Sequence, residues 1–399
     1  MQPLLPLFVF VDACGWEILR DDPFARAFAP ERRRLRSVLG YSSACIPSIL
    51  SGRWPADHRN WAYFVYDPEH SPFRGLRPLR WLPRALTGRR MFRRRLSKLV
   101  KRKLGFKGYF DLYNMPFDQL PQFDFSEKKN PLEPGGLNRG PNIFDALEEA
   151  GIPYHVSDPR RTERQNLDAL LADIAGEGID FAFLYWPALD GLLHRVGNRS
   201  PEVGVKLRAY EGWLGELMSA AGSHYSRVRL SIFSDHGMAN CERILDLRAR
   251  IDALGLRAGS DYAAVYDSTM ARFWFLNPES RQRITARLET VPEGRILPES
   301  ELEQLGARFP DRYFGELIFL VDEGVLIVPS DMGARPMRGM HGYHPDAPQS
   351  YAALLTNTAD VPADLTAIPH MYGLMLAQAR EAARERRPTA HLSPNLTVS

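Results

Sequence analysis

Short, almost continuous apolar runs alternate along the chain with longer segments whose apolar positions recur at helical spacing. The apolar runs, each ending in polar residues, cover residues 6–12, 152–157, 180–187 and 228–235. The amphipathic segments cover residues 143–150, 161–175 and 201–221. Strands that are apolar throughout are typical of a parallel sheet buried on both faces, and helices between them imply right-handed crossovers. The pattern predicts an α/β fold with a mostly parallel central sheet.

The second half of the chain is less regular. Residues 271–276 have the pattern of a strand, and residues 315–330 that of a hairpin that turns at Asp-Glu-Gly. They predict a smaller β-rich insertion at about residues 260–335. The stretch IPHMYGLMLAQAREAARERR predicts a closing amphipathic helix, and we expect residues 386–399 to form a disordered tail. The remainder, residues 1–385, is expected to be a single domain.

The composition is that of an ordinary soluble protein, with 399 residues, 44% hydrophobic and 25% charged. No apolar run reaches the roughly 18 residues typical of a membrane span. The first apolar run lacks a basic region and a cleavage site, so we interpret it as a buried strand and not as a signal peptide. Cys14, Cys45 and Cys241 are odd in number and widely spaced, which argues against a disulfide framework and a thiolate zinc site. These features favour a cytoplasmic protein.

Positive charge is concentrated in one segment. Residues 73–107 contain 14 Lys or Arg and no Asp or Glu. The rest of the chain therefore has 37 of the 51 basic residues and all 48 acidic ones. Apolar residues within the segment recur at helical spacing, at Phe92, Leu96, Leu99, Val100 and Leu104. The pattern predicts a basic cap or insertion at about residues 69–135. Its helix is of the kind that lies on an anionic membrane, so residues 74–107 are a candidate for peripheral membrane contact. A solvated cap and a site for polyanions remain alternatives, with nucleic acid less favoured.

Carboxylate and imidazole side chains stand at or after the ends of the predicted strands. The candidate metal ligands are Asp12, Asp190, His194, Asp235, His236 and His341. Asp190 and His194 are four residues apart, so in a helix they share a face and can bind one ion. Asp235 and His236 are adjacent at a strand end, where side chains alternate, so we expect them to serve two neighbouring ions. This mixed set suits two divalent ions, Zn²⁺ first, with Mn²⁺ or Mg²⁺ as alternatives.

These residues resemble the motifs of the alkaline phosphatase superfamily, in particular its type I phosphodiesterase and nucleotide pyrophosphatase branch. The matching stretches are Asp12, the serines before SGRWPADH, DGLLH, SDHGM and GMHGYHP. The resemblance implies an α/β three-layer sandwich that hydrolyses phosphoesters through a covalent phospho-enzyme. It also implies one ion held by Asp12, Asp235, His236 and the nucleophile, and a second held by Asp190, His194 and His341.

The nucleophile is sought in the stretch GYSSACIPSILSGRW. The family places it nine residues before the [ST] of an [ST]-G pair, here Ser51, which leads to Ser42, with Ser43 as the alternative. Ser48 and Ser51 are better interpreted as helix residues whose hydroxyls satisfy backbone groups. Cys45 resembles the sulfatase nucleophile, but its spacing differs and Ile49 replaces the sulfatase arginine, so a structural role under the helix is favoured.

Tyr63 occupies the position where the phosphodiesterase branch usually has an Asn that holds a phosphate oxygen. It is therefore a candidate substrate-binding residue. The sequence predicts a metal-dependent phosphodiesterase or nucleotide pyrophosphatase that uses Ser42. The alternatives are a phosphomonoesterase, a phosphonate hydrolase or a phosphotransferase acting on an anionic or lipid-linked substrate. A sulfatase and a binding protein without catalysis are less favoured.

Overall fold

The computed structural model describes residues 2–386, and a six-stranded sheet of order β2-β16-β7-β1-β6-β5 forms its centre. The strands are β1 (Gln2–Val11), β2 (Glu31–Leu35), β5 (Tyr154–Val156), β6 (Phe181–Trp186), β7 (Tyr225–Phe233) and β16 (Ala352–Thr356). Strands β7, β1, β6 and β5 run parallel to one another, whereas β16 is antiparallel to both β7 and β2. The predicted mostly parallel sheet is confirmed, and β2 and β16 are strands that the sequence pattern did not indicate.

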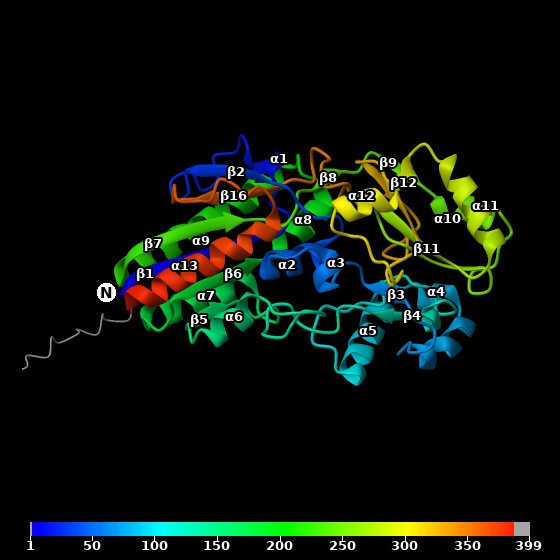
Figure 1. Ribbon diagram of the computed structural model, residues 1–399, viewed down its shortest axis with the longest axis horizontal. Coiled ribbons are helices and arrows are strands. Elements are labelled where there is room, and N and C mark those ends of the chain that lie inside the picture. Colours follow the sequence, from blue (N-terminus) through cyan, green and yellow to red (C-terminus); the bar gives the residue numbers. More distant parts are fainter. Residues whose placement is uncertain (1, 387–399) are drawn as a thin grey trace, which may run out of the picture.

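Helices cover both faces of this sheet (Figure 1). One face packs against α2 (Ser42–Ser51), α6 (Ile143–Glu149) and α13 (Met371–Arg386), and the other against α1 (Trp16–Leu19), α7 (Glu163–Ala175), α8 (Ala188–Val196) and α9 (Pro201–His224). Because successive side chains of a strand point to opposite faces, β1 places Phe8 and Phe10 in one core and Leu7 and Val9 in the other. The result is the expected α/β three-layer sandwich.

A second, antiparallel sheet of order β10-β11-β13-β12 forms a β-rich lobe. Its elements are β10 (Tyr262–Tyr266), β11 (Met270–Phe275), β12 (Gly294–Ile296), β13 (Leu317–Val321), α10 (Leu247–Asp252), α11 (Pro278–Glu289) and α12 (Glu299–Gln304). The predicted hairpin over residues 315–330 is wrong. The strand after the turn, β14 (Val325–Ile327), pairs in parallel with β9 (Arg243–Leu245), while β13 pairs with β11 and β12. Strands β13 and β14 therefore pair with strands distant in sequence and not with each other across the local turn.

The basic segment lies within an insertion below α2 and α3 (Pro55–His58) in Figure 1. Its elements are β3 (Phe64–Tyr66), η1 (Arg74–Trp81), α4 (Arg84–Thr87), α5 (Arg90–Leu104), η2 (Leu120–Gln122) and β4 (Phe123–Phe125), with β3 and β4 paired. Helix α5 contains the predicted helix, but most of its apolar face does not reach solvent. Val100 is buried, and Phe92, Leu96 and Leu104 pack against the same aromatic core, which also includes Trp274 of β11.

The short strands β8 (Ala239–Asn240) and β15 (Gly339–Met340) form an antiparallel pair beside the central sheet. At the end of the chain, η3 (Ile368–His370) leads into α13, which confirms the predicted closing helix. The expected disordered tail, residues 386–399, lies outside the described residues except for Arg386, which ends α13. Among the described helices, none combines the length and the apolar character that crossing a bilayer requires.

Candidate metal centre and catalytic cavity

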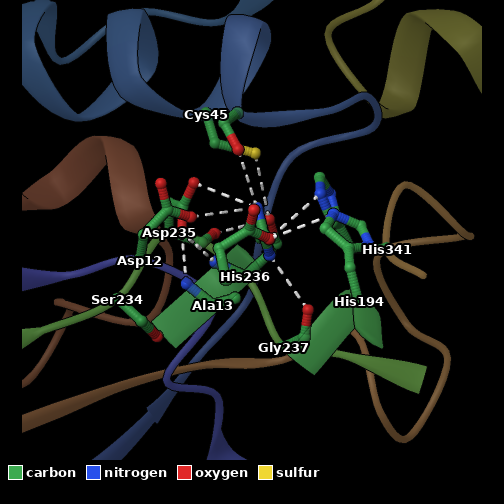
Figure 2. A network of polar contacts seen from close by, with 12 residues as sticks. Asp12, Ala13, Cys45, His194, Ser234, Asp235, His236, Gly237 and His341 are labelled. Carbon is green, nitrogen blue, oxygen red and sulfur yellow. Dashed lines mark hydrogen bonds and ion pairs between the residues drawn. The ribbon is translucent and has the colours of Figure 1, made fainter. Parts of the chain in front are cut away.

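The candidate metal ligands gather at the carboxyl edge of the central sheet in two groups of three. The groups are Asp12, Asp235 and His236, and Asp190, His194 and His341; within each group the ligand atoms lie within 4.8 Å of one another. Asp12 follows β1 and the Asp-His pair follows β7, the strand beside it. Figure 2 shows His236 between the two carboxylates on one side and the other two imidazoles on the opposite side. This grouping is the one that the resemblance implies.

Local structure explains how each group forms. Asp190 and His194 lie one turn apart on α8, with 3.3 Å between Oδ1 and Nε2. His341 follows β15, and the pairing of β15 with β8 brings it next to the segment that carries His236. Asp235 and His236 do not point to separate groups, contrary to the expectation from strand alternation. Strand β7 ends at Phe233, so the alternation of an extended strand no longer applies to them.

Backbone carbonyls orient two of the imidazoles. Nδ1 of His194 donates to the carbonyl of Gly339 and Nδ1 of His236 to that of Gly237, each at 2.9 Å. With Nδ1 engaged, Nε2 of each ring is turned toward the carboxylates and is available as a ligand. Gly237 itself is required for close packing, because a Cβ there would lie 2.2 Å from the carbonyl oxygen of Gln349.

The donor set fits divalent cations. Each of the three carboxylates keeps one buried oxygen without a hydrogen-bond partner among the described residues: Oδ1 of Asp12, Oδ1 of Asp190 and Oδ2 of Asp235. Buried carboxylate oxygens are costly unless a donor or a cation compensates them. Three such oxygens together with imidazole nitrogens form the kind of ligand set that zinc-like ions prefer.

The electrostatics of the cluster show the same demand for positive charge. Burial, reinforced by the carboxylates of Asp235 and Asp190, raises the pKa of Asp12 well above its ordinary value. Burial alone would lower the pKa of His236, but the Asp235 and Asp12 carboxylates outweigh it and raise that pKa to about 9. His341 behaves differently, because burial and the neighbouring His236 lower its pKa well below the usual value. The carboxylates thus favour a positively charged His236, while His341 stays neutral and suited to bind a metal ion.

Ser42 is the first residue of α2, and its hydroxyl oxygen lies 3.0 Å from Nε2 of His236. The alternative, Ser43, is buried and donates its hydroxyl to the carbonyl of Trp61 at 3.0 Å. Ser48 and Ser51 donate to the carbonyls of Ala44 and Pro47 one turn earlier, as expected for helix serines. Of the four hydroxyls, the one that faces the metal-ligand candidates is that of Ser42.

Cys45 lies on α2 and is not among the residues that line the cavity. Its side chain is fully buried, and its sulfur lies 3.5 Å from the hydroxyl of Ser37. Burial, followed by the charge of Asp235, raises the pKa of the Cys45 thiol well above its ordinary value. A buried, protonated thiol is a poor nucleophile, which favours the structural role.

Two polar contacts around the cluster were not recognised in the sequence. The hydroxyl of Tyr185 donates to Oδ2 of Asp12, and the hydroxyl of Ser37 donates to the backbone carbonyl of Asp235 at 2.7 Å. Such contacts hold candidate ligands in place from behind. The position of Tyr185 near the end of an otherwise apolar strand was the available signal, whereas Ser37 lies in a loop and gave none.

A cavity of about 1510 Å³ opens above the cluster and is shared by the sheet edge and the insertion. Ser42, Asp12 and Tyr63 line it, and the Tyr63 ring stacks on Phe125 at 5.4 Å. Cationic side chains from three separate segments also line it: Arg89, Arg90, Arg94, Lys101 and Lys107 of the insertion, Arg160 and Arg161 after β5, and Arg335 after β14. The basic insertion therefore forms one wall of the cavity that contains the candidate nucleophile.

Comparison with known proteins agrees with this arrangement. A family model described as type I phosphodiesterase / nucleotide pyrophosphatase matches residues 37–344. Murine ectonucleotide pyrophosphatase / phosphodiesterase 5 has 16% sequence identity and a TM-score of 0.64, with 95% of each chain covered. Phosphonoacetate hydrolase from Sinorhizobium meliloti 1021, in complex with phosphonoacetate, has 13% identity and a TM-score of 0.64, with 95% of this chain and 96% of that chain covered. At these identities the two structures support the fold, whereas the family match covers most of the sequence.

The resemblance to the alkaline phosphatase superfamily is thereby confirmed. The chain belongs to the type I phosphodiesterase / nucleotide pyrophosphatase family and is a hydrolase of phosphoric ester bonds.

Proposed function

We propose that this protein is a metal-dependent phosphodiesterase or nucleotide pyrophosphatase that acts through a covalent phosphoserine at Ser42. The observation that carries the proposal is the position of the Ser42 hydroxyl, 3.0 Å from Nε2 of His236, in the cavity that residues of both groups of candidate ligands also line. Ser42 would share the first group with Asp12, Asp235 and His236. Two divalent ions, Zn²⁺ first and Mn²⁺ or Mg²⁺ as alternatives, would lower the pKa of the attacking hydroxyl and stabilise charge on the phosphoryl oxygens.

The residues of the chain account for the remaining steps. The Ser42 oxygen forms a bond to phosphorus as the bond from phosphorus to the alcohol oxygen of the ester breaks. The serine proton goes to solvent and the departing alkoxide takes one up. Water then displaces Ser42 from phosphorus and restores its hydroxyl. Because Ser42 begins α2, the backbone N–H groups at the start of that helix would favour the negative charge of the phosphoryl oxygens in both steps. Tyr63, which lines the same cavity, would donate its hydroxyl to one of those oxygens.

The walls of the cavity support an anionic substrate. Arg90, Arg94 and Arg161 make no ion pair with any residue that the structure describes, so their charge is available to a ligand. The volume of about 1510 Å³ exceeds the roughly 300–1,000 Å³ of typical small-ligand sites. A phosphodiester in which one of the two ester groups is large or carries further charge would use this space.

The test is turnover of a chromogenic phosphodiester by the protein loaded with Zn²⁺ or Mn²⁺, before and after chelation. We expect turnover that chelation abolishes, and elemental analysis that finds two ions per chain. Parallel assays with a phosphomonoester, a phosphonate and a sulfate ester separate the related reactions, and product analysis with an added alcohol detects phosphoryl transfer. Turnover that survives exhaustive chelation would disprove the metal-dependent mechanism.

A further inference from the structure

The insertion exposes large apolar side chains although it has a core of its own. Trp81 is 78% exposed, Met91 67% and Leu99 64%, and Leu82 and Leu86 are also exposed. These five account for half of the large exposed apolar residues in the described part of the chain. Scattered exposed apolar residues are normal, whereas their concentration in one segment makes that segment a candidate interaction surface.

These side chains are not the amphipathic face expected from the sequence. On α5, Phe92, Leu96 and Val100 pack against the core of the insertion, and Leu99 is the one predicted position that stays exposed. The exposed residues before α5 lie on or beside η1 and α4, and α4 contacts α5. We call Trp81, Leu82, Leu86, Met91 and Leu99 the docking surface.

The charge around the docking surface selects its partner. Every charged residue from 73 to 107 is basic, and the guanidinium of Arg80 lies 4.6 Å from the centre of the Trp81 ring. Exposed Trp, Leu and Met among Arg and Lys suit a surface that is anionic outside and apolar a few ångströms deeper, which describes an anionic phospholipid bilayer. Nucleic acid would use the cations but leave Leu82, Leu86 and Leu99 in water.

The docking surface borders the catalytic cavity, because Met91 belongs to both. On the same helix, Arg90 and Arg94 line the cavity that also contains Ser42. We propose that the docking surface binds the protein to anionic phospholipid bilayers and presents the mouth of the cavity to the phosphodiester of a lipid headgroup. Binding to the bilayer does not depend on catalysis, whereas the lipid phosphodiester as substrate rests on the proposed phosphodiesterase function.

The test is flotation with vesicles of phosphatidylglycerol or of phosphatidylcholine. Deleting the insertion would remove an aromatic core that includes Phe110 and Phe125, so point variants are needed. We expect the wild-type protein to float with phosphatidylglycerol vesicles, and the variant Trp81→Ser/Leu82→Ser/Leu86→Ser to bind them at least about tenfold more weakly. The control, Val205→Ser/Ile244→Ser, changes exposed apolar residues outside the insertion (59% and 58%) and should bind like wild type.

Two further measurements separate docking from catalysis. Ser42→Ala should float like wild type, and the triple variant should keep its turnover of a soluble chromogenic diester while losing that of vesicle phosphatidylglycerol. Wild-type protein that ignores phosphatidylglycerol vesicles, or a triple variant that binds them equally well, would overturn the docking proposal, as would tight binding of an oligonucleotide by a protein that does not float. If the protein floats and turns over the soluble diester but leaves phosphatidylglycerol intact, the lipid substrate is wrong and docking stands.

Discussion

The hydroxyl oxygen of Ser42 lies within hydrogen-bonding distance of Nε2 of His236, although 194 positions separate the two residues in the chain. Two adjacent parallel strands make this possible. Strand β7 ends just before His236 and pairs along its length with β1, and α2, which begins at Ser42, covers one face of the sheet at the same edge. Ligands of open α/β sheets bind at this edge, and the contact supports the proposal that Ser42, and not its neighbour Ser43, is the nucleophile.

The first prediction concerns the two adjacent serines. Ser42→Ala should lower kcat for a phosphodiester by about 10³-fold or more, because it removes the attacking oxygen. Ser43→Ala should keep kcat within about tenfold and cost about 1 kcal/mol of stability, since the Ser43 hydroxyl donates a hydrogen bond to the Trp61 carbonyl. Steady-state kinetics and urea unfolding of both variants check this. The reverse ranking of kcat would assign the nucleophile to Ser43.

The second prediction concerns the hydroxyl that Tyr185 donates to Asp12. Tyr185→Phe should weaken metal binding by about 10–100-fold, because Asp12 loses the group that orients it. Tyr41→Phe is the matched control, since its hydroxyl contacts Thr269 and not a candidate ligand. Zn²⁺ titration against a competing chelator gives both affinities without an activity assay. Equal affinities in the two variants would contradict a role of Tyr185 at the metal centre.

The third prediction concerns Tyr63. Burial raises its pKa well above the ordinary value, so its hydroxyl stays protonated and can donate at neutral pH. Tyr63→Phe keeps the ring on Phe125 and should lower kcat/KM for a diester by about tenfold, as expected for one lost hydrogen bond to a charged oxygen. Tyr109→Phe, which removes the hydroxyl of the ring adjacent to Tyr63, serves as the control. An unchanged kcat/KM in Tyr63→Phe would leave this residue a packing role.

The fourth prediction separates this protein from sulfatases. Cys45→Ala should leave phosphodiester turnover within about twofold of wild type and cost roughly 1–2 kcal/mol of stability, because it leaves a small void under α2. Kinetics, thermal unfolding and the intact mass of the wild-type protein check it. Loss of turnover in Cys45→Ala, or an aldehyde at this position in the mass spectrum, would restore the sulfatase reading.

The fifth prediction concerns pH and Glu127, which lines the cavity and has one buried oxygen without a partner among the described residues. Burial raises its pKa from 4.5 to about 8. The folded protein therefore holds this proton more tightly than the unfolded chain, so the stabilising contribution is complete below about pH 4.5 and is lost as the pH rises toward 8.

Replacing Glu127 by Gln removes this loss. Relative to wild type, Glu127→Gln should gain roughly 4 kcal/mol in the free energy of unfolding between pH 5 and pH 8.5. Urea unfolding at both pH values measures the difference, and the exposed Glu289→Gln is the control that should show none. A difference between Glu127→Gln and wild type that does not change with pH would show that the Glu127 carboxyl has an ordinary pKa.

The features that could be predicted from the sequence are those encoded by neighbouring residues. Asp12 follows an unbroken apolar strand, and the spacing of Asp190 and His194 places both on one turn of α8. Distant pairing escaped prediction. Strand β2 is mostly basic, with the sequence ERRRL, and it becomes a strand because β16 pairs with it at the edge of the sheet.

The basic helix shows the same limit. Its amphipathic spacing correctly predicted a helix, and α5 spans Arg90–Leu104. The spacing of apolar residues does not tell what covers an apolar face. Here Phe92, Leu96 and Val100 of α5 pack against the core of the insertion itself. Of the residues that do face solvent, Trp81, Leu82 and Leu86 lie on or beside short elements, and Met91 and Leu99 lie on α5 outside its packed face; they become visible as a surface once the chain is folded.

The separate core of the insertion has an evolutionary consequence. Phe110 and Phe125 belong to that core, whereas the candidate ligands stand on strands and a helix held by the two cores of the central sheet. Mutations in the insertion that lie away from the cavity wall can therefore accumulate without disturbing the candidate metal ligands. Relatives that keep the catalytic residues but carry a different insertion should share the chemistry and differ in the molecules they recruit, so this segment is the natural target for redirecting the enzyme to new substrates.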